Sequence, residues 1–375
     1  MKIVDWKVYT PDKNFHVFLE LQTDTNVTGW GAAYSEREQV LGALGWLKRF
    51  VIGENPLEME RVTEKLHQIT FWLGRGGAMT HAISAINLAL WDVAGTFAGQ
   101  PVSVLLGGRY REAEPAYGSV LFAPVETLPA RIESMLARGF RAIKLGWDPF
   151  GHQSLQDDEA LIRLARKATG NKTTLMIDAG GSYPFWKLRF KDSLERAKML
   201  ADYQIHWFEE PLAPDDLEGY QRLTDASPVK IAHGEVLTQR KSFAPYFSRR
   251  AMDIVQPDVA KVGGLSEMRR IAWMAEEHGI DMVPHGWNTA VGVAADLQLV
   301  ASLPSGSFIE FNTGNALVEE LIQPPFTLDA TGCLPVPQSP GLGVTIDRER
   351  LKQFEVSGYA SESWTWDSNR EFEAH

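Results

Sequence analysis

Three carboxylate residues stand at the ends of successive short β-rich runs in the middle of the chain. They are Asp178, Glu209 and Glu235, spaced 31 and 26 residues apart. A single carboxylate at a strand end usually caps a helix or pairs with a loop cation, but three in succession are hard to explain in that way. Three oxygen donors with no cysteine or histidine among them favour Mg²⁺, or Mn²⁺, over zinc. The spacing therefore predicts a metal site.

An aspartate and a histidine end the next two β-rich runs. Asp258 stands in QPDVAKVGG and His285 in PHGWN. Adjacent parallel strands would place the two side chains next to each other. A carboxylate beside an imidazole orients the ring and raises its basicity, as a general base requires. A lone histidine is better explained as a buried core residue, so the prediction of a catalytic pair depends on the aspartate.

The elements that must position these residues alternate regularly after Gly108. Short β-rich runs, separated mostly by helical patterns, occupy Glu114–Leu121, Ala142–Gly146, Thr174–Asp178, His206–Glu209, Lys230–Glu235, Ile254–Asp258, Asp281–His285 and Phe308–Phe311. This alternation predicts a (β/α)₈ barrel or an open doubly wound sheet. Almost every run ends near an ionisable residue, Lys144 and Glu310 included. Since the strand ends of a barrel converge on the face that holds the active site, these residues favour the barrel.

The first hundred residues follow another pattern. Residues 15–22, FHVFLELQ, are β-rich and precede turn residues, which predicts a β-meander. Helical patterns follow over residues 39–50, 56–72 and 80–98. We therefore expect a separate α+β unit before the barrel.

Composition excludes several classes of protein. The 375 residues carry a net charge of −11, which disfavours binding to the phosphate backbone of nucleic acids. No run of eighteen apolar residues and no signal-peptide pattern is present, so we expect neither a membrane span nor secretion. The single cysteine, Cys333, excludes a disulfide framework and a cysteine-based zinc site. A cytoplasmic protein is expected.

Along nearly its whole length the chain resembles the mandelate racemase subgroup of the enolase superfamily. FHVFLELQTDTNVTGWG resembles the capping-domain meander, and AISAINLALWDVAGTFAGQPVSVLLGG resembles the first signature segment. MIDAG, WFEEP and AHGE resemble the three metal-ligand strands, QPDVAKVGG with PHGWN the Asp–His pair, and FIEFN the eighth-strand glutamate. The resemblance implies an α/β fold, a modified TIM barrel with an α+β capping domain. We expect the capping domain over residues 1–110, the barrel over 111–320, and a C-terminal segment over 321–375 that completes the capping domain.

The resemblance also implies the chemistry. Asp178, Glu209 and Glu235 would bind Mg²⁺, and Mg²⁺ would hold the carboxylate of a small-molecule substrate. The reaction expected is dehydration of an aldonic or aldaric acid sugar to a 2-keto-3-deoxy acid. Racemisation, epimerisation or lactone cycloisomerisation through the same enediolate is the alternative, and a carboxylate-binding pseudoenzyme is an alternative of another class. Relatives commonly assemble, so a homo-oligomer is expected.

The remaining roles follow from the same resemblance. His285, held by Asp258, would remove the proton α to the carboxylate, and Glu310 would hydrogen-bond that carboxylate. The second strand reads Lys144-Leu145-Gly146, where relatives often carry Lys-x-Lys, so Gly146 replaces a second base. A single-base syn elimination is therefore favoured over two-base racemisation. Lys144 is expected to contact the substrate carboxylate or to act as a base, against the alternative of a rim lysine with a packed stem.

Aromatic residues near these strand ends are candidates for substrate contacts. Trp147 and Trp287 flank the expected site and could stack on a sugar, although core or rim packing is more common. Tyr183 lies in a segment, residues 181–191, that is longer than usual in the family, where a pocket wall and a surface loop are equally reasonable. Lys261, three residues after Asp258, is interpreted as structural.

Overall fold

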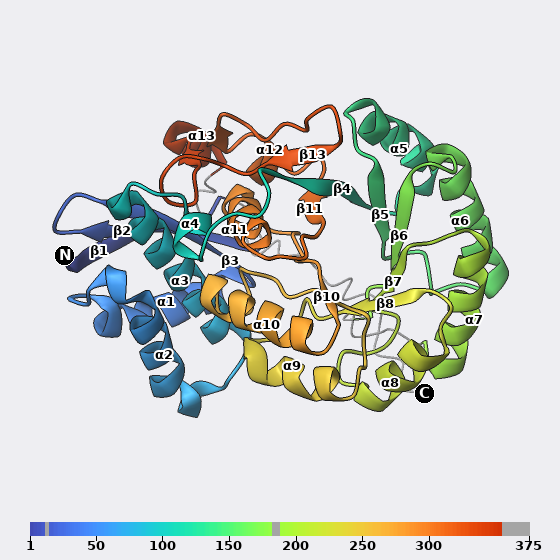
Figure 1. Ribbon diagram of the computed structural model, residues 1–375, viewed down its shortest axis with the longest axis horizontal. Coiled ribbons are helices and arrows are strands. Elements are labelled where there is room, and N and C mark those ends of the chain that lie inside the picture. Colours follow the sequence, from blue (N-terminus) through green and yellow to red (C-terminus); the bar gives the residue numbers. More distant parts are fainter. Residues whose placement is uncertain (12–14, 182–187, 355–375) are drawn as a thin grey trace.

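The computed structural model of the protein describes residues 1–11, 15–181 and 188–354 (Figure 1). The chain begins with an antiparallel meander, as predicted, in the order β1-β2-β3. Its strands are β1 (Ile3–Tyr9), β2 (His16–Thr23) and β3 (Thr28–Tyr34). The helices that follow are α1 (Arg37–Val51), η1 (Pro56–Glu58), α2 (Met59–Ile69), η2 (Phe71–Leu73), α3 (Gly77–Ala98) and α4 (Val102–Leu105).

Helix α3 packs directly on strand β3, and small residues allow the close approach. A Cβ atom at Gly31 of β3 would lie 1.9 Å from the carbonyl oxygen of Ala85 in α3. Any larger residue at Gly31 would therefore push the helix away from the meander. This contact explains why α3 is rich in alanine and buried over most of its length.

Eight parallel strands form the second part of the molecule. They are β4 (Ala113–Leu121), β5 (Ala142–Gly146), β6 (Thr174–Asp178), β7 (Trp207–Glu209), β8 (Lys230–His233), β9 (Ile254–Val255), β10 (Asp281–Met282) and β11 (Ile309–Asn312). Neighbours pair in chain order from β4 to β10, and β11 pairs with β4. A buried cluster with members from successive strands, among them Tyr117, Met176, Trp207 and Ile254, fills a common interior. The predicted modified barrel is confirmed.

Helices cover the outside of these strands, as Figure 1 shows for α5 to α10. Their bounds are η3 (Val125–Thr127), α5 (Leu128–Ala137), α6 (Leu155–Thr169), α7 (Phe190–Asp202), α8 (Leu217–Ala226), α9 (Gln239–Ser248), α10 (Leu265–Glu277) and α11 (Ala290–Ala301). The helical patterns predicted over 157–168 and 265–277 correspond to α6 and α10.

The C-terminal segment contacts both parts of the molecule. It contains α12 (Ala316–Glu319), β12 (Ile322–Gln323), β13 (Cys333–Pro335), β14 (Thr345–Ile346) and α13 (Arg348–Phe354). Strand β13 pairs antiparallel with β4, and the Leu342 N–H donates to Asp92 of α3 at 2.7 Å. The exact domain boundaries, 110/111 and 320/321, stay a prediction.

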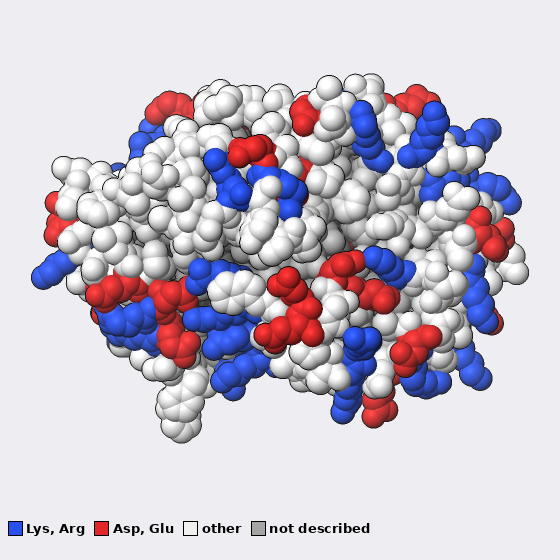
Figure 2. Space-filling view, in the orientation of Figure 1, with Lys and Arg blue, Asp and Glu red and all other residues white. Residues whose placement is uncertain are grey.

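The helices and the charged surface of the molecule show two further properties. Within the described residues, no helix combines the length and the apolar character that crossing a membrane requires. Figure 2 shows acidic and basic side chains interspersed over the face that it presents.

Candidate active site

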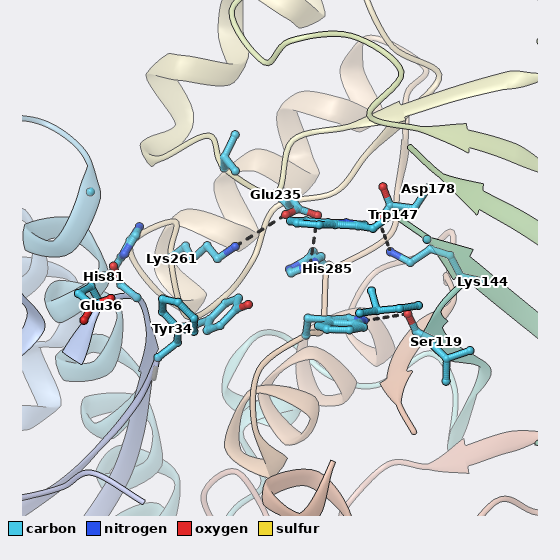
Figure 3. A pocket seen from close by; sticks show the side chains of 18 of the residues that line it. Tyr34, Glu36, His81, Ser119, Lys144, Trp147, Asp178, Glu235, Lys261 and His285 are labelled. Atoms are coloured by element: carbon cyan, nitrogen blue, oxygen red, sulfur yellow. Dashed lines mark hydrogen bonds and ion pairs between the residues drawn. The ribbon is translucent and has the colours of Figure 1, made fainter. Parts of the chain in front are cut away.

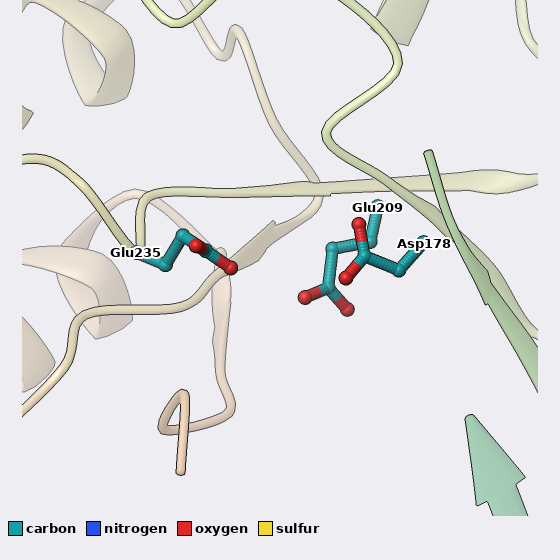
Figure 4. Close-up of side chains that lie close together, drawn as sticks. All are labelled: Asp178, Glu209 and Glu235. Carbon is teal, nitrogen blue, oxygen red and sulfur yellow. The ribbon is translucent and has the colours of Figure 1, made fainter. Parts of the chain in front are cut away.

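Asp178, Glu209 and Glu235 lie at the carboxyl ends of three neighbouring strands. Asp178 ends β6 and Glu209 ends β7, and the two are paired in register, while Glu235 follows β8 by two residues. One ligand oxygen of each lies within 4.8 Å of the others, and all three residues are buried (Figure 4). The structure therefore brings the three predicted ligands together.

The electrostatics of this cluster favour a bound cation. Burial and then the charge of Glu209 raise the pKa of Asp178 well above its usual range, and burial raises the pKa of Glu235. A divalent cation would relieve this repulsion, and carboxylate oxygens are the ligands that Mg²⁺ and Mn²⁺ prefer. Trp207 Nε1 and Gln256 Nε2 each donate to Glu209 Oε2 at 2.9 Å, which fixes that carboxylate. The donor set fits a divalent metal with oxygen ligands.

Asp258 and His285 form a hydrogen-bonded pair just beyond β9 and β10, where their backbones make an isolated parallel bridge. His285 Nδ1 lies 2.8 Å from Asp258 Oδ2, and the Ala260 N–H donates to Asp258 Oδ1 at 2.7 Å. His285 Nε2 faces Glu235 Oε2 at 3.2 Å. The imidazole ring is thus held at Nδ1, and its Nε2 points at the three-carboxylate cluster of Asp178, Glu209 and Glu235.

The pair shifts the proton affinity of both members. Burial lowers the pKa of His285, but the charge of Glu235 and the hydrogen bond to Asp258 raise it more, so the net shift is upward. Burial raises the pKa of Asp258, but the hydrogen bond with His285 and the charge of Lys261 hold it below its usual range. An ionised aspartate beside a more basic imidazole is the arrangement that a general base requires.

Lys144 lies among carboxylates on the other side of the cluster. Its Nζ is 2.5 Å from Glu209 Oε1, 3.0 Å from Glu310 Oε1 and 3.8 Å from Asp178 Oδ2, and the side chain is only 2% exposed. Burial opposes its charge, but Glu209 and Glu310 outweigh burial and raise the pKa of Lys144 well above its ordinary value. Lys144 therefore lies among carboxylates that favour its charged form.

Glu310 is held in its ionised form. The Gly286 N–H donates to Glu310 Oε2 at 2.7 Å. Burial raises the pKa of Glu310, but the charges of Lys144 and His285 lower it below its usual value. An ionised carboxylate accepts hydrogen bonds and donates none, so in this form Glu310 pairs with Lys144 and cannot itself donate to a substrate carboxylate.

Several of these residues line one cavity of about 570 Å³ (Figure 3). Its wall contains Lys144, Asp178, Glu235 and His285 from the barrel. The opposite wall comes from the first hundred residues and includes Tyr34, at the end of β3, and His81 of α3. The active site predicted at the carboxyl ends of the strands thus gains a second wall from the capping part.

Trp147 and Trp287 both line the cavity, as predicted. Trp287 Nε1 donates to Ser119 Oγ at 2.8 Å, which orients its indole. Trp147 has a φ of +65°, and a Cβ at Gly180 would come within 3.0 Å of its indole. Gly180 therefore makes room for Trp147. Tyr183, the third aromatic candidate, lies outside the described residues.

The sequence matches two family models in the same order as the structural parts. Residues 4–107 match the mandelate racemase / muconate lactonizing enzyme N-terminal domain, and residues 127–350 match the enolase C-terminal domain-like family. The chain belongs to the mandelate racemase / muconate lactonizing enzyme family. The resemblance drawn from the sequence is confirmed.

Individual family members include both dehydratases and cycloisomerases. A D-galactarolactone cycloisomerase of Agrobacterium fabrum is 32% identical, with 92% of each chain covered. A D-galactonate dehydratase of Ralstonia pickettii is also 32% identical, over 90% of this chain and 91% of the relative. The crystal structure of the 3,6-anhydro-D-galactonate cycloisomerase from Zobellia galactanivorans superimposes with a TM-score of 0.88 at 31% identity, over 95% of this chain and all of that one.

Some residues that line the cavity were not predicted from the sequence. Tyr34 and His81 were not singled out, since both come from the capping part and no local pattern links them to the barrel. Lys261 was interpreted as structural, yet it lines the cavity, with Nζ 4.0 Å from Glu235 Oε1. Its position three residues after Asp258, in a turn that leaves the strand end, was the available signal.

Proposed function

We propose that the protein is a Mg²⁺-dependent lyase that removes the proton α to the carboxylate of an acid sugar and expels the β-substituent. One observation carries the proposal: the three-carboxylate cluster and the His285–Asp258 pair face each other in one cavity. When bound, the cation would supply a Lewis acid for the substrate carboxylate and for the charge that develops as the α-proton leaves.

The side chains of the site then have separate roles in substrate binding and proton transfer. Lys144 donates a hydrogen bond to the substrate carboxylate, and Glu310 holds the Lys144 ammonium in place. His285 Nε2 accepts the α-proton, and Asp258 stabilises the imidazolium that results. The same imidazolium returns the proton to the departing β-hydroxyl, which leaves as water. The enol product ketonises to a 2-keto-3-deoxy acid, so atoms and charge balance with one acid–base residue.

Residue 146, where relatives often carry a second lysine, is a glycine in this chain. A Cβ at Gly146 would lie 3.1 Å from Asp178 Oδ2, so even a small side chain would crowd a predicted metal ligand. The Trp147 indole, which cannot accept a proton, follows directly and lines the cavity. Chemistry from a single face is what this arrangement supports, and a two-base racemase is disfavoured.

Ring opening of a lactone by β-elimination is the second candidate function. Two of the compared relatives are cycloisomerases that act on a lactone or an anhydro sugar acid, as their names state. In a lactone the leaving group is a carboxylate, which needs no proton from the enzyme. His285 would then serve only as the base.

The test is a screen of the purified protein with Mg²⁺ against acid sugars and their lactones. We expect 2-keto acid from a narrow set, and a loss of about 10²- to 10⁴-fold in kcat in His285→Asn. The variant should still bind Mn²⁺, measured by electron paramagnetic resonance. Keto acid from free acids identifies a dehydratase, and keto acid from lactones alone identifies a cycloisomerase.

A negative screen would contradict the proposal in a defined way. Exchange of the α-proton with D₂O without keto acid would indicate an isomerase. No exchange, with carboxylate binding retained, would indicate a binding protein without activity.

The setting of the enzyme is part of the proposal. We infer a cytoplasmic homo-oligomer that acts on small molecules. The single cysteine supports a reducing compartment, and light scattering of the purified protein would give its oligomeric state.

A further inference from the structure

A second lysine in the cavity, Lys261, makes no hydrogen bond to the part of the chain that the structure describes. The Lys261 side chain is only 11% exposed, and it lines the cavity. Its Nζ lies 4.0 Å from Glu235 Oε1, beyond hydrogen-bond range, and 4.5 Å from the centroid of the Tyr34 ring. Within the described chain, no acceptor lies within hydrogen-bond distance of this ammonium group.

The ammonium group of Lys144, by contrast, has carboxylate acceptors within the protein. Lys144 hydrogen-bonds Glu209 and lies 3.0 Å from Glu310. An aromatic ring stabilises a cation but does not replace its conventional hydrogen bonds. Because Lys261 lines the cavity and has no acceptor among the described residues, its hydrogen bonds are available to water or to a ligand.

The nearest carboxylate does not accept these hydrogen bonds. Glu235 is one of the three predicted metal ligands, and its charge would be shared with the cation. Asp258 is hydrogen-bonded to His285 Nδ1 and to the Ala260 N–H. The described carboxylates nearest to Lys261 therefore have other partners, and neither accepts a hydrogen bond from its ammonium group.

The groups around Lys261 suit a polar ligand. In Figure 3 the Tyr34 hydroxyl points into the cavity, and Lys261 extends between the Tyr34 ring and Glu235. His81 lies beyond them on the capping side. Burial and then the charge of Lys261 lower the pKa of His81 to about 3, so its imidazole is neutral and can donate one hydrogen bond. Glu36 also lines the cavity. It lies beside His81, at the end of the cavity away from Asp178 (Figure 3).

The positions along the cavity define two ends. Lys144 and Asp178 lie on one side of Glu235 and His285, and Lys261 lies on the other side (Figure 3). A substrate whose first carboxylate is at Lys144 and whose α-carbon is at His285 therefore extends toward Lys261.

We propose that Lys261, with Tyr34, binds a second carboxylate, so that the substrate is a dicarboxylic acid sugar or its lactone rather than a monocarboxylic one. This inference rests on the proposed function, which places the first carboxylate. In the lactone case the second carboxylate is the group released when the β C–O bond breaks, and its electron pair stays on the departing oxygen. Lys261 would then balance the charge formed on that oxygen.

The test uses two unreactive acids of equal chain length. 2-Hydroxyglutarate and 2-hydroxypentanoate share the metal-binding end and differ only in a distal carboxylate or methyl group. Calorimetric titration of the Mg²⁺-loaded protein should show 2-hydroxyglutarate binding about tenfold tighter or more, as a charge-assisted hydrogen bond provides. Lys261→Met should abolish this preference, and Lys261→Gln provides a second neutral variant.

The controls distinguish failure of the Lys261 proposal from failure of the proposed function. Lys230→Met removes a surface lysine that pairs with Asp281, and it should keep the preference. Equal affinity of the wild-type protein for both acids, or a preference that survives in both neutral Lys261 variants, overturns the inference alone. Binding of neither acid in the presence of Mg²⁺ contradicts the proposed function itself.

Discussion

At the scale of single residues, the shape of the cavity depends on a glycine. Gly180 has a φ of +62°, in the left-handed region, and its missing Cβ leaves the space that the Trp147 indole occupies. A side chain at Gly180 would strain the backbone and displace a wall of the substrate pocket. The two effects can be separated, because Gly99 lies in the left-handed region with a φ of +64° and has no atom within 4 Å of its absent Cβ.

We expect both Gly180→Ala and Gly99→Ala to lower the free energy of unfolding by roughly 1–2 kcal/mol from backbone strain. Only Gly180→Ala should also raise KM, several-fold, because it moves Trp147. Urea denaturation and steady-state kinetics measure the two effects. An unchanged KM in Gly180→Ala would show that the Trp147 indole does not contact the substrate.

At the scale of elements, one buried aspartate of α3 joins three segments of the chain. Asp92 accepts the N–H of Trp30 in β3 and the N–H of Leu342 in the C-terminal segment, both at 2.7 Å. Burial outweighs these two hydrogen bonds and raises the pKa of Asp92 to about 6. The folded protein therefore binds this proton more tightly than the unfolded chain does.

The sign of the pH effect follows directly. Because the folded-state pKa of Asp92 exceeds the unfolded value, its contribution to stability falls as the pH rises toward and through 6. Asp92→Asn removes the titration and one acceptor. We expect the variant to be less stable than the wild type at pH 4.5, and the gap to narrow by about 2 kcal/mol at pH 7. A gap in the free energy of unfolding that is independent of pH, by urea denaturation, would exclude this role.

At the scale of the whole molecule, folding concentrates negative charge at the mouth of the barrel. Asp178, Glu209 and Glu235 come together only in the folded state, so a cation that binds them stabilises folding by mass action. At a Mg²⁺ concentration of 100 times Kd, the free energy of unfolding should increase by about 2.7 kcal/mol.

Thermal unfolding in EDTA and in Mg²⁺ checks this prediction. We expect Mg²⁺ to raise the Tm of the wild type and to leave the Tm of Glu209→Gln nearly unchanged. Glu195→Gln, which alters an exposed glutamate of α7, should respond like the wild type. An equal Mg²⁺ response in Glu209→Gln would place the cation elsewhere.

The helices and strands and their order were largely predictable from the sequence, because periodicity and turn residues are local properties. The residues at which β9 and β10 end were not predictable in this way. Each pairs over only two residues, whereas the β-rich runs extend over five. The chain leaves the regular ladder before Asp258 and His285, and this departure allows the two side chains to meet as a bridge beyond the strands.

The sequence by itself determined which carboxylates gather and which histidine has an aspartate beside it. Residues at the ends of consecutive parallel strands must meet at one face, whatever packs elsewhere. Only the tertiary structure decided what Lys144, Glu310 and Lys261 do. Their charge states and partners depend on contacts with residues that stand between 24 and 227 positions away in the sequence, since burial and Coulomb interactions act through space and not along the chain.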